Sequence, residues 1–198
     1  MTEEQYITAL KNNPHGVRNI PNPTEEMQLV CVEQNGMLLQ YIKNPTDRVI
    51  ETALAQSPRA IQYVDNPSDE LLISLVKQDW AVLEYIQHPS DDVVRIALDQ
   101  SGWAIRYITN PSEELQLRAV ETQYDALQYI ANPSERVQMA AVKSNYLSLR
   151  YIQNPTLDIL KAAVLQDPQA MRQITNLDLD TVVELSLIHI SEPTRLAL

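Results

Sequence analysis

Proline recurs along this chain at a fixed interval, and that interval limits the fold more than any other feature. Seven prolines follow one another at 22-residue steps, and Asn precedes each of them except Pro89, which follows His88. The members of the series are Pro23, Pro45, Pro67, Pro89, Pro111, Pro133 and Pro155. A period of this length indicates tandem units that stack on one another, because one such unit cannot bury its own apolar face.

The period divides the chain into eight repeats and the beginning of a ninth, which starts at Asp178. Each full repeat starts at a hydroxyl side chain: Thr2, Thr24, Thr46, Ser68, Ser90, Ser112, Ser134 and Thr156. Such a residue is a favoured N-cap, and the acids after it, as in Glu25-Glu26, suit the positive end of a helix dipole. We therefore predict a first helix of about ten residues. One column of this helix, meaning the position that is equivalent in successive repeats, is mostly alanine. A side chain this small lets neighbouring helices approach closely.

A second, shorter helix is predicted in each repeat. Its starting column carries Asn, Ser or Asp in all but one repeat, and Pro14, Pro58 and Pro168 follow directly, at a position that tolerates proline. The next Asn-Pro ends it after about seven residues, because the residue before proline disfavours α geometry. The sequence thus predicts an all-α fold, an α-solenoid of eight 22-residue two-helix repeats plus a truncated ninth, over residues 1–184. It leaves open whether the second helix is α or 3₁₀.

Two columns are interpreted as structural ladders, because a binding code would vary between repeats and these columns do not. The tyrosines are expected to lie against the core, with each phenol reaching a loop carbonyl or an Asn: Tyr41, Tyr63, Tyr85, Tyr107, Tyr129 and Tyr151. The asparagines are expected to cap or bridge successive turns: Asn44, Asn66, Asn110, Asn132 and Asn154.

The repeat unit at residues 104–120 and 126–142 reads Ala, Leu or Ile, any residue, Tyr-Ile, any residue, Asn-Pro-Ser-Glu, and ends on Ala-Val. It resembles the short helical repeats of an uncharacterised family of bacterial and phage proteins, known only as a domain of unknown function. That resemblance covers nearly all of residues 2–177 and implies a repeat fold but no activity. More distantly, the unit is similar to leucine-rich variant repeats, which are longer than 22 residues and pair an α-helix with a 3₁₀-helix. This second resemblance implies a partly 3₁₀ second helix.

The last residues depart from the repeat. From Leu185 the chain reads Leu-Ser-Leu-Ile-His-Ile-Ser-Glu-Pro-Thr-Arg, which resembles a translated transposase-type sequencing adapter. We expect residues 185–198 to be a non-native tail on a truncated metagenomic frame, whose natural protein continues with more repeats. His189 would then have no function.

Composition argues against several classes of function. The formal net charge of −11 and the pI near 4.6 disfavour nonspecific binding to nucleic acids or anionic membranes. One Cys and three His provide neither a disulfide framework nor a zinc site, and the three Gly are too scattered for a phosphate loop. No signal-like start and no apolar run of about 18 residues occurs. We expect a soluble cytoplasmic protein that is not an enzyme and has no cofactor or metal.

Two features are candidates for binding. Aromatic residues gather where the first helix of a repeat gives way to the second, at Trp80, Trp103, Tyr124 and Tyr146. They would either anchor a peptide or simply cover the ends of adjacent helices. The acids at the helix starts form a second candidate, either as a binding stripe or as solvated partners of the helix dipoles.

The function expected from the sequence is a non-catalytic repeat scaffold that binds a protein or peptide, with the partner unknown. One alternative is an acidic nucleic-acid mimic or inhibitor of a basic protein. Another is the recognition arm of an enzyme whose catalytic part is missing. Reading of nucleic acid by a repeat code is disfavoured, because Arg106, Arg150 and Arg172 share their column with Glu84 and several Gln.

Overall fold

The computed structural model describes residues 1–174, 181, 183 and 185–187, and in these residues it confirms an all-α array of paired helices. The chain divides into two compact units, residues 1–90 and 91–198. The first contains α1 (Glu3–Asn12), η1 (Pro14–Asn19), α2 (Glu25–Gln34), η2 (Gly36–Tyr41), α3 (Asp47–Gln56), η3 (Pro58–Tyr63), α4 (Asp69–Gln78) and η4 (Trp80–Tyr85). The second contains α5 (Asp91–Gln100), η5 (Gly102–Tyr107), α6 (Glu113–Thr122), η6 (Tyr124–Tyr129), α7 (Glu135–Ser144), η7 (Tyr146–Tyr151), α8 (Leu157–Gln166) and η8 (Pro168–Gln173).

The first helices begin where the sequence predicts. Each α-helix listed above has ten residues, and a hydroxyl usually caps its free N–H groups, as where Ser68 accepts from the Leu71 N–H at 3.3 Å. In α1 the cap is reciprocal, because Thr2 accepts from the Gln5 N–H while the Gln5 side chain accepts from the Thr2 N–H. In these helices, side chains of the same repeat mark the start of the helix.

The second helices are 3₁₀ along their whole six-residue length, which answers the question that the sequence left open. One extended residue, such as Asn35 with φ of −154°, both ends the α-helix and caps the 3₁₀-helix. Its Oδ1 atom accepts from the Met37 N–H at 3.1 Å. The Ile42 N–H then closes the last turn on the Leu39 carbonyl, three residues back.

The asparagines before the prolines have a backbone role. Asn44, Asn66, Asn110 and Asn132 adopt φ between 50° and 53°, in the left-handed region. We expected this column to cap or bridge successive turns. The structure gives another reason for Asn, since it enters the left-handed region more easily than residues other than Gly.

This explanation separates two substitutions of Asn132. Asn132→Ala should lower the free energy of unfolding by about 1 kcal/mol, because alanine resists positive φ. Asn132→Gly should leave it within about 0.5 kcal/mol of the original, because glycine accepts positive φ at little steric cost. Urea titrations followed by far-UV circular dichroism measure both values. Equal losses would instead show that the amide group of Asn132 stabilises the turn.

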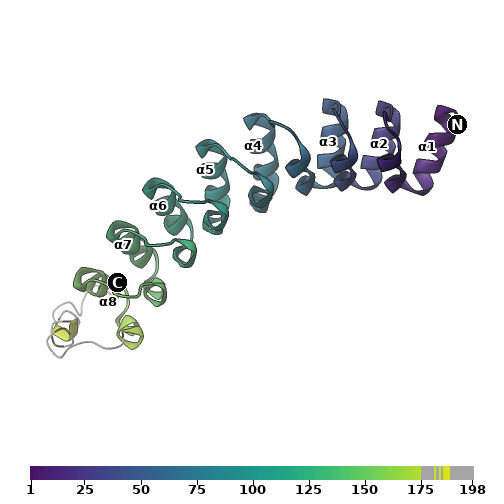
Figure 1. Ribbon diagram of the computed structural model, residues 1–198. Coiled ribbons are helices and arrows are strands. Elements are labelled where there is room, and N and C mark those ends of the chain that lie inside the picture. The colour runs from purple at the N-terminus through teal and green to yellow at the C-terminus, as the bar shows by residue number, and fades with distance from the viewer. Residues whose placement is uncertain (175–180, 182, 184, 188–198) are drawn as a thin grey trace. The chain divides into compact units, whose positions relative to one another are not determined.

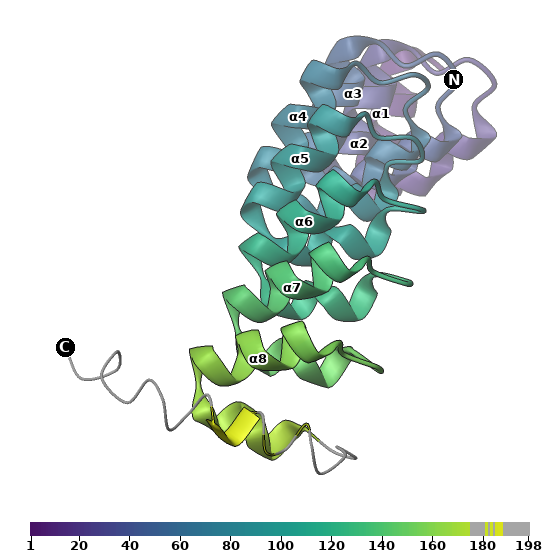
Figure 2. The same cartoon turned by 90° about the vertical axis from the view of Figure 1, so that its left-hand side faces the viewer.

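Within each unit the two kinds of helix form two layers around one core. The α-helices lie side by side along one side and the 3₁₀-helices along the other (Figure 1). The alanines of the small column, such as Ala119 and Ala141, are fully buried, and so are apolar residues of the 3₁₀-helices such as Leu127, 2% exposed. The turns from each 3₁₀-helix to the next α-helix project from one side of the second unit (Figure 2).

The end of the described chain continues this core. Leu185, the first residue of the tail expected to be non-native, is fully buried among Ile159, Ala163 and Val164. It occupies the column that Ala163 holds one repeat earlier. Residues 188–198, His189 included, lie outside the described residues, as does most of the expected ninth repeat.

Candidate functional site

The exposed side of the 3₁₀-helices is the most distinctive surface of the second unit. A 3₁₀-helix has three residues per turn, so residues three apart share one side. In η5 Ala104 and Ile105 are buried, whereas Trp103 and Arg106 are exposed. We call this surface the 3₁₀ face of residues 91–174 and define it by Trp103, Arg106, Tyr107, Tyr129, Arg150, Tyr151 and Arg172.

The tyrosines of the column lie at the edge of the core, and those of the second unit belong to the 3₁₀ face. Tyr41 and Tyr129 are 41% and 40% exposed, and the other four rings are half-buried. Each tyrosine is the last residue of its 3₁₀-helix, beyond the buried residues that anchor that helix. In consequence the column forms a row of rings at the rim of the core in each unit.

Arginine side chains stack on several of these rings. The guanidinium of Arg106 lies 4.8 Å from the centroid of the Tyr107 ring and 5.8 Å from that of Tyr129. Arg150 lies 5.9 Å from the Tyr151 centroid, and in the first unit Arg59 lies 5.5 Å from that of Tyr85. Such cation–π contacts attract the guanidinium group to the face of the ring. Sequence reasoning missed this arrangement, although Arg directly precedes Tyr at both 106 and 150.

The arginines of α5, α6 and α7 are arranged differently, because acids neutralise them. Arg118 binds Asp99 through Nε and Nη2, and this bond lowers the pKa of the Asp99 carboxyl. Arg95 contacts Asp92 at 3.1 Å and Glu114 at 3.3 Å. By contrast, none of the ion pairs found among the described residues involves Arg106, Arg150 or Arg172.

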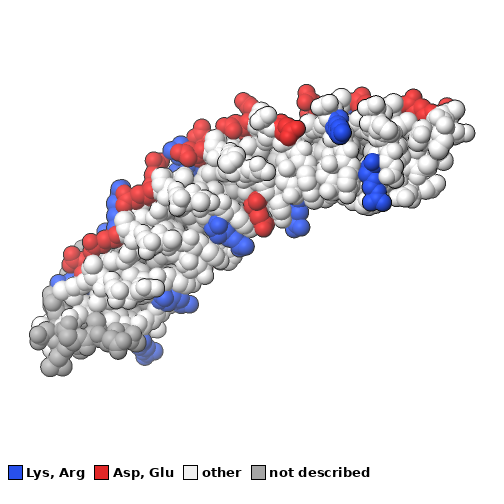
Figure 3. All heavy atoms as spheres, viewed as in Figure 1, with Lys and Arg blue, Asp and Glu red and all other residues white. Residues whose placement is uncertain are grey.

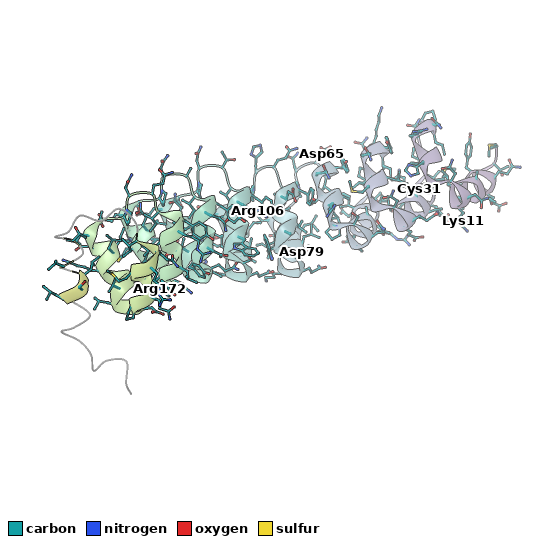
Figure 4. The ribbon with its side chains drawn as sticks, turned by 90° about the horizontal axis from the view of Figure 1, so that it is seen from below. Lys11, Cys31, Asp65, Asp79, Arg106 and Arg172 are labelled. Carbon is teal, nitrogen blue, oxygen red and sulfur yellow. The ribbon has the colours of Figure 1, made fainter. Side chains whose placement is uncertain are left out.

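The charges of the second unit are therefore divided between its two sides. In the space-filling view, Asp and Glu gather along the α-helical side, together with their Arg partners, and isolated Lys or Arg side chains project from the opposite side (Figure 3). Figure 4 looks onto the side of the 3₁₀-helices and labels Arg106 and Arg172. A basic, aromatic surface thus lies on a chain whose net charge is −11.

The structure places the four predicted aromatic residues in different surroundings. Trp103 is 36% exposed on the 3₁₀ face, and its Nε1 donates to Asp125 Oδ1 at 2.8 Å. Tyr146 packs against the cluster that contains Leu149 and Ile159, and Tyr124 is half-buried. Trp80 is half-buried in the first unit. Of the candidates in the second unit, Trp103 is the one that the structure exposes on the 3₁₀ face.

A hollow recurs between successive turns. In the second unit it has a volume of about 600 Å³ and is lined by Tyr151, Asn132 and Gln138, among others. In the first unit a hollow of about 420 Å³ is lined by Tyr85, Asn66 and Leu72, each 66 residues earlier in the chain. The repeat thus produces the same concave site in both units, with a tyrosine of the column in its wall.

The acids at the helix starts bind the next repeat. The cap hydroxyl of one repeat donates to the first Glu of the helix before it, at 2.6 Å from Thr24 to Glu3 and at 2.7 Å from Thr156 to Glu135. Thr46 with Glu25 and Ser134 with Glu113 repeat this contact. Backbone and Ser68 hydrogen bonds lower the pKa of Glu70, at the same end of α4. These carboxylates accordingly have structural partners.

The single cysteine is a core residue. Cys31 is fully buried, and burial raises the pKa of its thiol to about 11. At pH 8 the folded protein should react with a disulfide reagent such as DTNB more than about 100-fold slower than the unfolded protein, because the thiolate is the attacking form. Absorbance at 412 nm with and without urea measures both rates. Equal rates would contradict the burial of Cys31.

Several kinds of site were not found. Among residues 1–174 and the few described beyond them, no three His, Cys, Asp or Glu side chains come together to hold a metal ion. Within the same residues no helix is long and apolar enough to cross a membrane. No family model, curated protein or solved structure matches the chain.

Proposed function

We propose that this chain is a non-catalytic repeat scaffold that binds a protein or peptide along the 3₁₀ face of residues 91–174. The observation that carries the proposal is the row of solvent-accessible rings along one side, where Tyr107, Tyr129 and Tyr151 recur every 22 residues and Trp103 precedes Tyr107 in the same helix. Large aromatic side chains supply much contact area at low entropic cost, and they are common anchors of protein interfaces.

Selection of peptides from a phage-displayed library on the immobilised chain tests this function. We expect enriched peptides to lose at least tenfold in affinity when Trp103→Ala and Tyr129→Ala are combined, with the far-UV circular dichroism unchanged. The matched control is Leu165→Ala, because Leu165 is an apolar side chain, 51% exposed, on α8. Failure to enrich any peptide would contradict the function, and an equal loss in the control would contradict the choice of face.

The acidic-mimic alternative receives less support. A mimic needs carboxylates that are free to meet a basic partner. Here Glu3, Glu25, Glu113 and Glu135 accept hydrogen bonds from the next repeat, and Asp92, Asp99 and Glu114 pair with arginines. Since these groups already stabilise the stacking of repeats, we favour the scaffold that binds through its opposite side.

A further inference from the structure

We infer that the partner of the 3₁₀ face is an extended acidic peptide whose carboxylates are separated by multiples of three residues. This inference rests on the proposed function and specifies the chemistry of the partner. It follows from three features of the face, which are the lack of ion pairs between its arginines and other described residues, the contacts that hold these arginines, and the spacing of the repeats.

Charge complementarity indicates that the partner is negatively charged. Each of the helices η5–η8 has two outward-facing positions, equivalent to Trp103 and Arg106 in η5. The charged residues at these positions are Arg106, Arg150, Arg172 and Asp125. Asp125 already accepts from the Trp103 ring N–H, and the arginines take part in no ion pair of the described residues. A partner with separated carboxylates would supply the missing counter-charges.

The same charges favour a peptide over a nucleic acid. The chain as a whole carries −11, so a uniformly charged polyanion is repelled over much of its length. A peptide with a few acids between neutral residues carries less charge to repel. Its neutral residues would also have rings to rest on, such as that of Tyr129.

The arginines are positioned to receive carboxylates. The Arg106 guanidinium lies near the faces of Tyr107 and Tyr129, and these contacts use none of its N–H hydrogen-bond donors in an ion pair. Arg150 Nε donates to the Leu147 carbonyl at 3.0 Å, and this bond holds the side chain in place without using its two terminal NH₂ groups. A guanidinium held in this manner loses little side-chain freedom when it binds a carboxylate.

The repeat spacing gives the register. Neighbouring 3₁₀-helices of the second unit approach closely, and packed helices lie roughly 8–10 Å apart. An extended polyproline-type peptide advances about 3.1 Å per residue, so three of its residues span about one repeat. Arg150 comes two repeats after Arg106, and Arg172 one repeat further. Acids at positions 1, 4, 7 and 10 of a decapeptide therefore meet all three arginines in either chain direction.

Fluorescence anisotropy with a labelled decapeptide tests this register. The probe has Glu at positions 1, 4, 7 and 10 and Pro or Ala elsewhere. Its isomer has the same composition with the four Glu adjacent, and an oligothymidylate of ten nucleotides represents nucleic acid. We expect the spaced peptide to bind at least tenfold more tightly than either.

Two double variants then locate the binding. Arg106→Gln with Arg150→Gln should weaken the spaced peptide at least tenfold. Arg95→Gln with Arg136→Gln removes the same charge from the α-helical side and should change affinity less than twofold. Equal losses in the two variants, equal binding of the two isomers, tighter binding of the oligonucleotide, or no binding of the spaced peptide at 50 mM salt would each overturn the inference.

Failure of this inference differs from failure of the proposed function. If library-selected peptides depend on Trp103 and Tyr129 but the spaced acidic peptide does not bind, the scaffold function stands and the acidic chemistry is wrong. If neither kind of peptide binds, both proposals fail.

Discussion

Leu127→Ala should lower the free energy of unfolding by about 2–5 kcal/mol, because it removes a side chain that fills the core between η6 and its neighbours. Leu127 is only 2% exposed, and a helix as short as the six-residue η6 depends on packing of such side chains for its stability. Urea denaturation followed by circular dichroism measures the change.

The comparison for this variant is Leu165→Ala, which removes the same group from a side chain that is 51% exposed. It should cost less than about 0.5 kcal/mol, as most surface substitutions do. If Leu127→Ala were as mild as Leu165→Ala, the 3₁₀-helices would not be anchored through their buried residues.

Ala141→Asp should have an equally large effect, and that effect should depend on pH. Ala141 is fully buried on α7, a helix whose other buried residues are Val137 and Val142. A carboxyl buried in this manner has its pKa raised by about 3 units, which corresponds to a loss of about 4 kcal/mol when it is charged.

The direction of the pH dependence follows from that shift. The folded-state pKa of the new carboxyl lies above the unfolded value near 3.9, so the variant is closest to the original protein below about pH 4. Its stability falls as the pH rises toward the folded-state pKa. Thr109→Asp, at an exposed turn, is the control and should show no such dependence. Denaturation at pH 4 and pH 8 measures both, and a pH-independent loss would contradict burial of the carboxyl.

Much of the fold can be predicted from local sequence signals, such as the residues that cap each helix. Ser68 and its acids fix where α4 begins, and Asn35 fixes where α2 ends and η2 begins, so the boundaries of these helices are predictable. The type of the second helix is not, because buried residues at Leu38, Leu39 and Ile42 suit both α and 3₁₀ periods over six residues. Hydrogen bonding within the folded chain decides between them.

The candidate site was harder to predict, because its features depend on neighbouring repeats. The unvarying tyrosine column suggested a structural role beside the core, but it did not reveal that Tyr129 contacts Arg106 of the repeat before it. The acids illustrate the same limit. Glu25 suits the dipole of its own helix, but its bond to Thr46, 21 residues away, emerges only when the repeats stack. Both contacts join residues that are about one repeat apart in the sequence, and this constant spacing was the signal that could have revealed them.

Quenching of Trp103 fluorescence tests most directly the claim that the 3₁₀ face is the binding surface. The chain has two tryptophans, so Trp80→Phe leaves Trp103 as the one reporter. Acrylamide should quench this tryptophan in the free protein, and saturation with a bound peptide should reduce the Stern–Volmer constant at least twofold, because the peptide covers the ring. An unchanged constant at full occupancy, established in parallel by the anisotropy of the labelled peptide, would show that the partner binds elsewhere.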